Sequence, residues 1–76
     1  MEEKIRTLIA QVLNVAVSEV ELDTEIGELD EWDSLRNVEI ISQLQKEFDV
    51  TITPEMIMDL EDVADIVSLI EDLTED

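Results

Sequence analysis

Three consecutive residues near the middle of the chain, Asp33, Ser34 and Leu35, form its most informative short sequence. An aspartate before a helix can accept hydrogen bonds from the N–H groups of the first turn, so Asp33 is the expected N-cap. Ser34 then becomes the first helical residue, beside free N–H groups and at the positive end of the helix dipole. Serine is also common at helix starts for structural reasons alone, so the position by itself identifies no function.

The side chains on which most enzymes depend are missing. The chain has no His, Cys or Tyr, so the usual general bases and strong nucleophiles are absent. A calcium loop built on the turn glycine Gly27 would place Leu22, Thr24 and Ile26 at its ligand positions, and two of these lack a side-chain oxygen. We therefore expect no catalytic residue, no metal site and a protein that is not an enzyme.

The spacing of apolar residues predicts an all-α fold, a four-helix bundle with three main helices and one short helix. Thr53 followed by Pro54 is typical of an N-cap with proline at the first helical position, and Asp62 lies near the start of the last helix. The predicted helices are Glu2–Leu13, Ser34–Phe48, a short one from Pro54 to about Met58, and one that includes Val63 to Leu73.

The stretch between the first two predicted helices, residues 15–32, contains apolar residues without a helical period. We expect a long ordered loop that is pinned to the core, with at most a short turn of helix. Trp32 is interpreted as the anchor of this loop over the core. Loops of this length are uncommon without a functional reason.

The helix that begins at Ser34 has apolar residues on two faces. Leu35 and Val38 point away from the predicted core, with Ser42 between them on the same side. Exposed aliphatic side chains are common and the preceding loop could cover them, so either a partner-binding face or an ordinary surface fits the pattern. The opposite sector is core-facing and holds Ile40, Ile41, Leu44 and Phe48. The partner-binding residues that we assign are Leu35, Val38, Glu39 and Leu60.

The composition limits both the class of protein and its partners. Seventy-six residues with 45% hydrophobic content are enough for one domain, residues 1–76, and too apolar for a disordered acidic tail. Four basic residues face 22 acidic ones, and the net charge of −18 disfavours nucleic acid and anionic membranes. Neither a signal peptide nor a membrane-spanning run is evident. We expect a cytoplasmic monomer whose partners offer basic surfaces.

These features together resemble the acyl carrier protein family. The resemblance rests on Asp33-Ser34-Leu35 at the start of a helix after a long loop, on the Glu47-Phe48 pair at the end of that helix, and on the order of the helices. It implies a four-helix bundle in which Ser34 carries 4'-phosphopantetheine, donated by coenzyme A through a phosphopantetheinyl transferase. The thiol of that arm would hold acyl cargo as a thioester. Acyl ligases, synthases or transferases with basic docking patches would be the other partners.

Two residues depart from the pattern of carriers in fatty-acid synthesis, where a small residue usually precedes the Asp-Ser pair. Trp32 stands there, and Arg36 replaces a common acid. A Trp-Asp-Ser start is similar to stand-alone carriers of specialised pathways, so we expect acyl cargo in a polyketide-like or fatty-acid-related pathway. Two alternatives remain open: an aminoacyl or D-alanyl carrier, although Met usually follows the serine there, and an unmodified acidic helical adaptor that docks through Leu35 and Val38.

Overall fold

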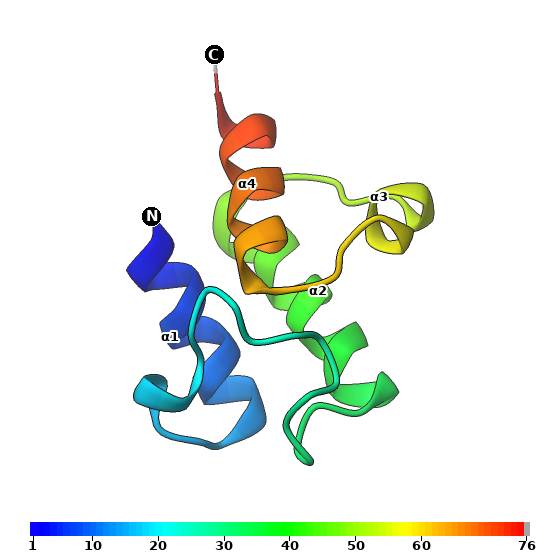
Figure 1. Cartoon of the computed structure of the whole chain (residues 1–76). Helices are drawn as coiled ribbons and strands as arrows, with labels where there is room; N and C mark the ends of the chain where they lie inside the picture. The colour runs from blue at the N-terminus through cyan, green and yellow to red at the C-terminus, as the bar shows by residue number, and fades with distance from the viewer. Residues whose placement is uncertain (76) are drawn as a thin grey trace.

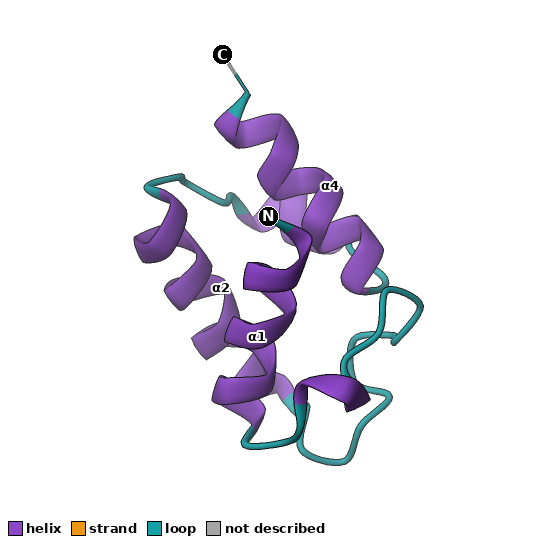
Figure 2. Ribbon diagram, turned by 90° about the vertical axis from the view of Figure 1, so that its left-hand side faces the viewer, coloured by secondary structure: helices purple, strands orange, loops and turns teal. Residues whose placement is uncertain are grey.

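The computed structural model describes residues 1–75, which form a helical bundle (Figure 1). A 3₁₀ turn, η1 (Val17–Glu19), lies in the loop between the first two helices. The described residues contain no strand, only an isolated bridge between Glu25 and Asp62 (Figure 2). The predicted all-α bundle with three main helices and one short helix is confirmed. Its helices are α1 (Glu2–Leu13), α2 (Ser34–Phe48), α3 (Pro54–Met58) and α4 (Val63–Thr74).

Three helix starts and two helix ends have a local cause that the sequence carries. Asp33 Oδ1 accepts the N–H of the third residue of α2 at 2.8 Å, and Asp62 Oδ1 does the same for α4 at 2.9 Å. Thr53 Oγ1 caps α3 in the same way at 3.3 Å. The predicted caps Asp33 and Thr53 are confirmed, and Asp62, expected from the sequence only near the start of its helix, is the third cap. Helices α1 and α2 end at Asn14 and Asp49, which adopt left-handed conformations with φ of 59° and 53°.

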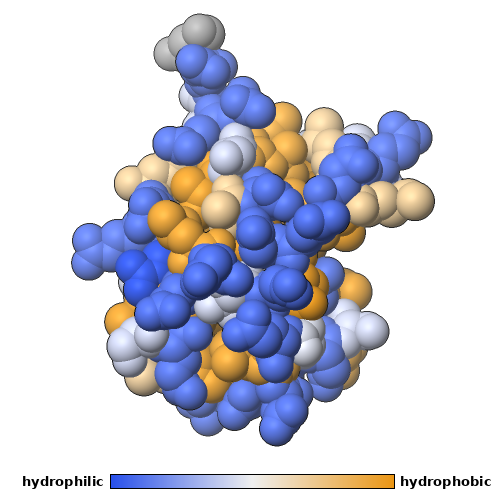
Figure 3. All heavy atoms as spheres, in the orientation of Figure 1, coloured by the Kyte–Doolittle hydropathy of each residue, from blue (hydrophilic) through white to orange (hydrophobic). Residues whose placement is uncertain are grey.

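The core is aliphatic and takes one face from each long helix. Helix α1 packs against both α2 and α4, and hydrophilic side chains dominate the face drawn in Figure 3. The predicted core face of α2 is confirmed, except that Phe48 is only half-buried and packs at the edge. The buried side chains of the three long helices are Ile5, Ile9, Ala10, Leu13, Ile40, Ile41, Leu44, Val63, Ile66, Val67 and Ile70.

The loop between α1 and α2 is ordered and pinned to the rest of the fold, as predicted. Its backbone pairs with the start of α4, because the Ala64 N–H donates to Leu22 O at 2.9 Å and the Val63 N–H donates to Thr24 O at 3.0 Å. The loop donates in return from Ile26 N to the carbonyl of residue 61 at 2.9 Å. These bonds satisfy backbone groups that a covered loop would otherwise leave unpaired.

The same loop is also held by its own buried side chains and by an arginine of α1. Val20, Thr24 and Trp32 are buried, and Thr24 Oγ1 accepts the N–H of residue 21 at 2.9 Å. Arg6 of α1 donates to the backbone carbonyls of Val17 and Val20. The loop is therefore fixed along its length, and it delivers residue 33 to the start of α2 in a defined position.

Candidate functional site

Ser34 is the first residue of α2 and its side chain is exposed. The Asp33 cap occupies the N–H of Arg36, and the backbone carbonyl of Asp33 accepts the N–H of Asn37 at 3.0 Å. The N–H groups of Ser34 and Leu35 belong to the first turn of α2, where the helix itself offers no carbonyl to accept them. An exposed hydroxyl therefore stands beside two backbone donors at the positive end of the helix dipole.

Trp32 fixes the chain immediately before this site. Its side chain is 2% exposed, which confirms the prediction that it anchors the loop over the core. The indole Nε1 donates to Asn37 Oδ1 at 3.0 Å, one turn into α2. Upstream, Gly27 has a φ of 89°, which side chains other than glycine rarely tolerate, and so permits the turn that leads back to the helix.

The charges around Ser34 are negative. Asp30, Glu31 and Asp33 are all exposed on the approach to the helix. Arg36 is a nearby cation, but its Nη1 donates to Val12 O at 2.7 Å, at the C-terminal end of α1. That position suits a cation because the helix dipole is negative there. The guanidinium of Arg36 is therefore bound to α1, and the other charged residues on the approach to Ser34 are acidic.

The residues assigned to partner binding do not all lie in the same environment. Leu35 and Val38 are 68% and 66% exposed, which confirms that they point away from the core, and Glu39 is exposed beside them. Leu60 is half-buried, follows the end of α3 and packs on the core. Met58, at the end of α3, is 82% exposed. Sequence reasoning missed Met58 because only the placement of α3 shows which of its sides is covered.

A groove of about 260 Å³ lies between α2 and α3. The predicted surface contributes Val38 and Ser42 to it, and Gln45 links its walls by accepting the N–H of Ile52 on Oε1 at 2.9 Å. The sequence gives no sign of this groove, because its two walls are distant along the chain. It is lined by Asn37, Val38, Ile41, Ser42, Gln45, Ile52, Pro54 and Ile57.

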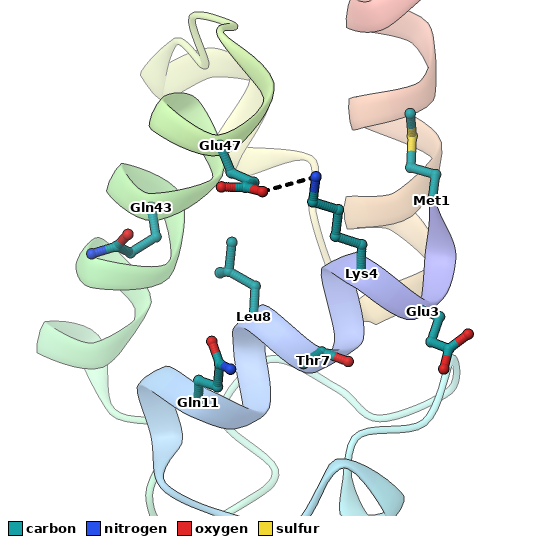
Figure 4. Close-up of a pocket in the computed structure, with 8 residues that line it drawn as sticks. All are labelled: Met1, Glu3, Lys4, Thr7, Leu8, Gln11, Gln43 and Glu47. Atoms are coloured by element: carbon teal, nitrogen blue, oxygen red, sulfur yellow. Dashed lines mark ion pairs between the residues drawn. The ribbon is translucent and has the colours of Figure 1, made fainter.

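A larger hollow of about 570 Å³ lies between α1 and α2, near the end of α2 that is distant from Ser34 (Figure 4). Lys4 Nζ crosses it to Glu47 Oε1 at 2.8 Å and lies 5.5 Å from the centroid of the Phe48 ring. The ion pair is exposed, so its contribution to stability is small. The side-chain amine and one of the carboxylates that line the hollow are joined to each other in this ion pair.

No group of three or more acidic side chains within residues 1–75 comes together in a way that could hold a metal ion. None of the helices in this part of the chain has the length and apolar content needed to cross a membrane.

Comparison with known proteins decides the family. The family model of the phosphopantetheine attachment site matches residues 3–70. The acyl carrier protein of Akkermansia muciniphila is 35% identical over 71 residues, which cover 93% of this chain and 89% of that protein. The chain belongs to the acyl carrier protein family. The Lactococcus lactis subsp. cremoris acyl carrier protein is 39% identical over 69 residues, which cover 91% of this chain and 90% of that protein.

The fold of this chain is also similar to that of a solved acyl carrier protein. The solution structure of a holo acyl carrier protein from Geobacter metallireducens matches with a TM-score of 0.85, covering 95% of this chain and 83% of that one. At 19% sequence identity, this match concerns the fold.

Family membership sets what the chain is in general terms. It is an acyl carrier protein with a phosphopantetheine attachment domain and a 4'-phosphopantetheine prosthetic group. Acyl carrier proteins are carriers rather than enzymes, and they work with synthases, transferases and phosphopantetheinyl transferases. The start of α2 fits the group, since it offers an exposed hydroxyl and unpaired backbone donors in one place.

Proposed function

We propose that Ser34 carries the phosphopantetheine arm and that the arm's thiol presents acyl intermediates to partner enzymes as thioesters. The observation that carries this proposal is the exposed Ser34 hydroxyl at the first position of α2, directly after the Asp33 cap. Three other serines are also exposed. Ser42 and Ser68 lie inside α2 and α4, where the N–H groups are bonded within the helix, and Ser18 lies in the 3₁₀ turn.

Attachment needs little chemistry from the chain itself. A bond forms between Ser34 Oγ and the phosphorus that bears the pantetheine, the pyrophosphate P–O bond of coenzyme A breaks, and adenosine 3',5'-bisphosphate leaves. The hydroxyl proton passes to the transferase, since this chain has no histidine to receive it. The chain supplies an accessible hydroxyl and an acidic approach through Asp30, Glu31 and Asp33, which favours a basic transferase.

Intact-mass measurement with coenzyme A and a phosphopantetheinyl transferase tests this assignment. The wild type and the matched control Ser42→Ala should gain the mass of one arm, whereas Ser34→Ala should gain none. Ser34→Ala should keep its melting temperature, because the cap belongs to Asp33. A mass gain by Ser34→Ala, or none by the wild type with several competent transferases, contradicts the proposal.

The proposed partner surface beside this serine consists of Leu35, Val38 and Glu39, and Leu60, which is half-buried against the core, is the fourth residue assigned to partner binding. Exposed apolar side chains beside an acidic one suit a partner patch that combines basic and apolar groups. Replacing Val38 by Glu should slow arm or cargo transfer and leave the melting temperature nearly unchanged. The contrast is Leu44→Asp, which places an unpaired charge in the core and should unfold the domain.

For the cargo, we propose acyl groups of a specialised pathway, polyketide-like or related to fatty-acid synthesis. The support is the pair of departures at Trp32 and Arg36 together with Leu35 after the serine. The mass of the group released from the arm of carrier isolated from its native cells tests this. A D-alanyl mass instead of an acyl mass would replace this proposal by the aminoacyl alternative.

A further inference from the structure

The hydrogen bond between Trp32 and Asn37 determines which way the Asn37 carboxamide points. An indole N–H can only donate, so the group that faces it at 3.0 Å is the carboxamide oxygen. The amide nitrogen, Nδ2, must then point away from the indole. Because Trp32 is 2% exposed and held in the core, it fixes this orientation without being on the surface itself.

The Nδ2 group of Asn37 is accessible. Within residues 1–75 no buried side-chain nitrogen or oxygen lacks a hydrogen-bond partner, and the side-chain bond of Asn37 is the one made through Oδ1. Asn37 is only half-buried and lines the groove between α2 and α3. Two donor protons are therefore available at the wall of a groove that is otherwise rich in aliphatic side chains.

This donor lies close to the proposed attachment site. Asn37 follows Ser34 by three residues, so the two are about one helical turn apart, or about 5 Å along the axis. Beyond Asn37 the groove is lined by Val38, Ile41 and Ile57. A chain leaving Ser34 and entering the groove would pass the Asn37 carboxamide before it meets the aliphatic wall.

We propose that Asn37 donates a hydrogen bond from Nδ2 to a carbonyl oxygen borne on the arm of Ser34, and that Trp32 is the positioning residue for this donor. The inference rests on the proposed attachment at Ser34. The acceptor belongs either to an amide of the arm or to the thioester-linked cargo, since both carry carbonyl oxygens. Bonding is favoured here because the aliphatic wall excludes competing water. Trp32 therefore acts on the arm or cargo without touching it.

The test is ¹⁵N-resolved NMR of the apo, holo and acyl-loaded protein, after intact mass has verified loading. On loading, the Asn37 side-chain amide protons should move downfield. Movement in the holo form assigns the acceptor to the arm, and movement only in the acyl form assigns it to the cargo. If neither form moves this signal, the inference is wrong while attachment at Ser34 stands. A wild type that gains no mass removes the proposed function, and this inference with it.

Two variants separate orientation from packing. Trp32→Phe keeps a buried aromatic ring but removes the indole donor, so the amide can turn over and the loading shift should be largely lost. Asn37→Asp keeps an oxygen for Trp32 but has no donor. It should retain the hydrogen-bonded indole N–H signal and, once loaded, lack the shifted amide. A loading shift in Trp32→Phe equal to that of the wild type would show that Trp32 has no positioning role.

Discussion

Two irregular segments flank α2, and they are held in different ways. Residues 14–33, before the helix, bury three side chains, Val20, Thr24 and Trp32, and pair their backbone with the start of α4. Residues 49–62, after it, include α3, and α3 has no buried residue. In that second segment Ile52 is the buried side chain, and its N–H is fixed by a glutamine of α2.

The difference matches what each segment does for the site. The first segment sets the position of Ser34, through the Asp33 cap and the Trp32 anchor. The second segment forms one wall of the groove. Its apolar side chains, such as Ile57, pack against the core but are only partly buried. The start of α2 is therefore held by more buried contacts than α3 is.

The largest effect expected from this contrast is that of Trp32→Ala. Removing a fully buried aromatic side chain costs about 3–5 kcal/mol, and the change also leaves Asn37 Oδ1 without its donor. Because small domains have a total stability of roughly 5–15 kcal/mol, the variant should be close to unfolding. Urea denaturation followed by circular dichroism measures the loss.

Ile57→Ala is the matched change on the α3 side. Ile57 is half-buried, so the free energy of unfolding should fall by only about 1 kcal/mol, a part of the burial energy of a whole aliphatic side chain. Equal losses from the two variants would show that α3 is held as firmly as the loop.

Hydrogen exchange should show the same contrast without any mutation. The amides of Val63 and Ala64, bonded to the loop, should exchange only by near-global unfolding. The amides of Ile57 and Leu60 donate to carbonyls within the α3 segment and should exchange by local opening. We expect protection factors at least about 100-fold lower for the α3 pair, or roughly 3 kcal/mol of opening free energy. Similar protection in both pairs would mean that the segments open together.

The two helix caps offer a smaller and more local comparison. Asp33→Ala removes the cap of a helix that is part of the core and should cost about 1 kcal/mol. Thr53→Ala removes the equivalent bond of α3 and should cost less in global stability, because α3 can fray while the core remains folded. Thermal melting of both variants checks this. A larger loss at Thr53 than at Asp33 would reverse the ranking of the two segments.

Sequence reasoning succeeded where the cause of a structure is local. The caps at Asp33 and Thr53 follow from side chains that reach the first turn of the helix they precede, and the core face of α2 follows from helical spacing. Ser34 was singled out by its short motif together with the order of the helices, and its role stays a prediction.

What sequence reasoning missed depends on segments that are distant along the chain. The pairing of Thr24 with Val63 joins residues whose proximity no local pattern reveals. The same holds for the groove between α2 and α3, whose walls come together only through tertiary packing. Trp32 was correctly interpreted as an anchor, but its bond to Asn37 required the relative placement of loop and helix.

The smallest effect is expected from salt, and it should also distinguish the two segments. The net charge of −18 is spread over a small surface, and the ion pair found among residues 1–75 joins Lys4 to Glu47. Salt at 0.1 M screens repulsion beyond about 10 Å. The melting temperature should therefore rise by a few degrees with sodium chloride, and further with millimolar magnesium at matched ionic strength.

The stabilisation by salt should differ between the two segments that flank α2. Neither segment contains a basic residue, and residues 14–33 carry eight carboxylates against five in residues 49–62. The first loop, however, receives the guanidinium of Arg6 on two of its backbone carbonyls, and Arg36 binds the nearby end of α1. Relief of repulsion should therefore slow hydrogen exchange in α3 more than at the junction of the loop with α4. A melting temperature indifferent to both salts would show that the carboxylates are already far enough apart for their charge to be harmless. An equal slowing of exchange in both segments would show that their charge environments do not differ.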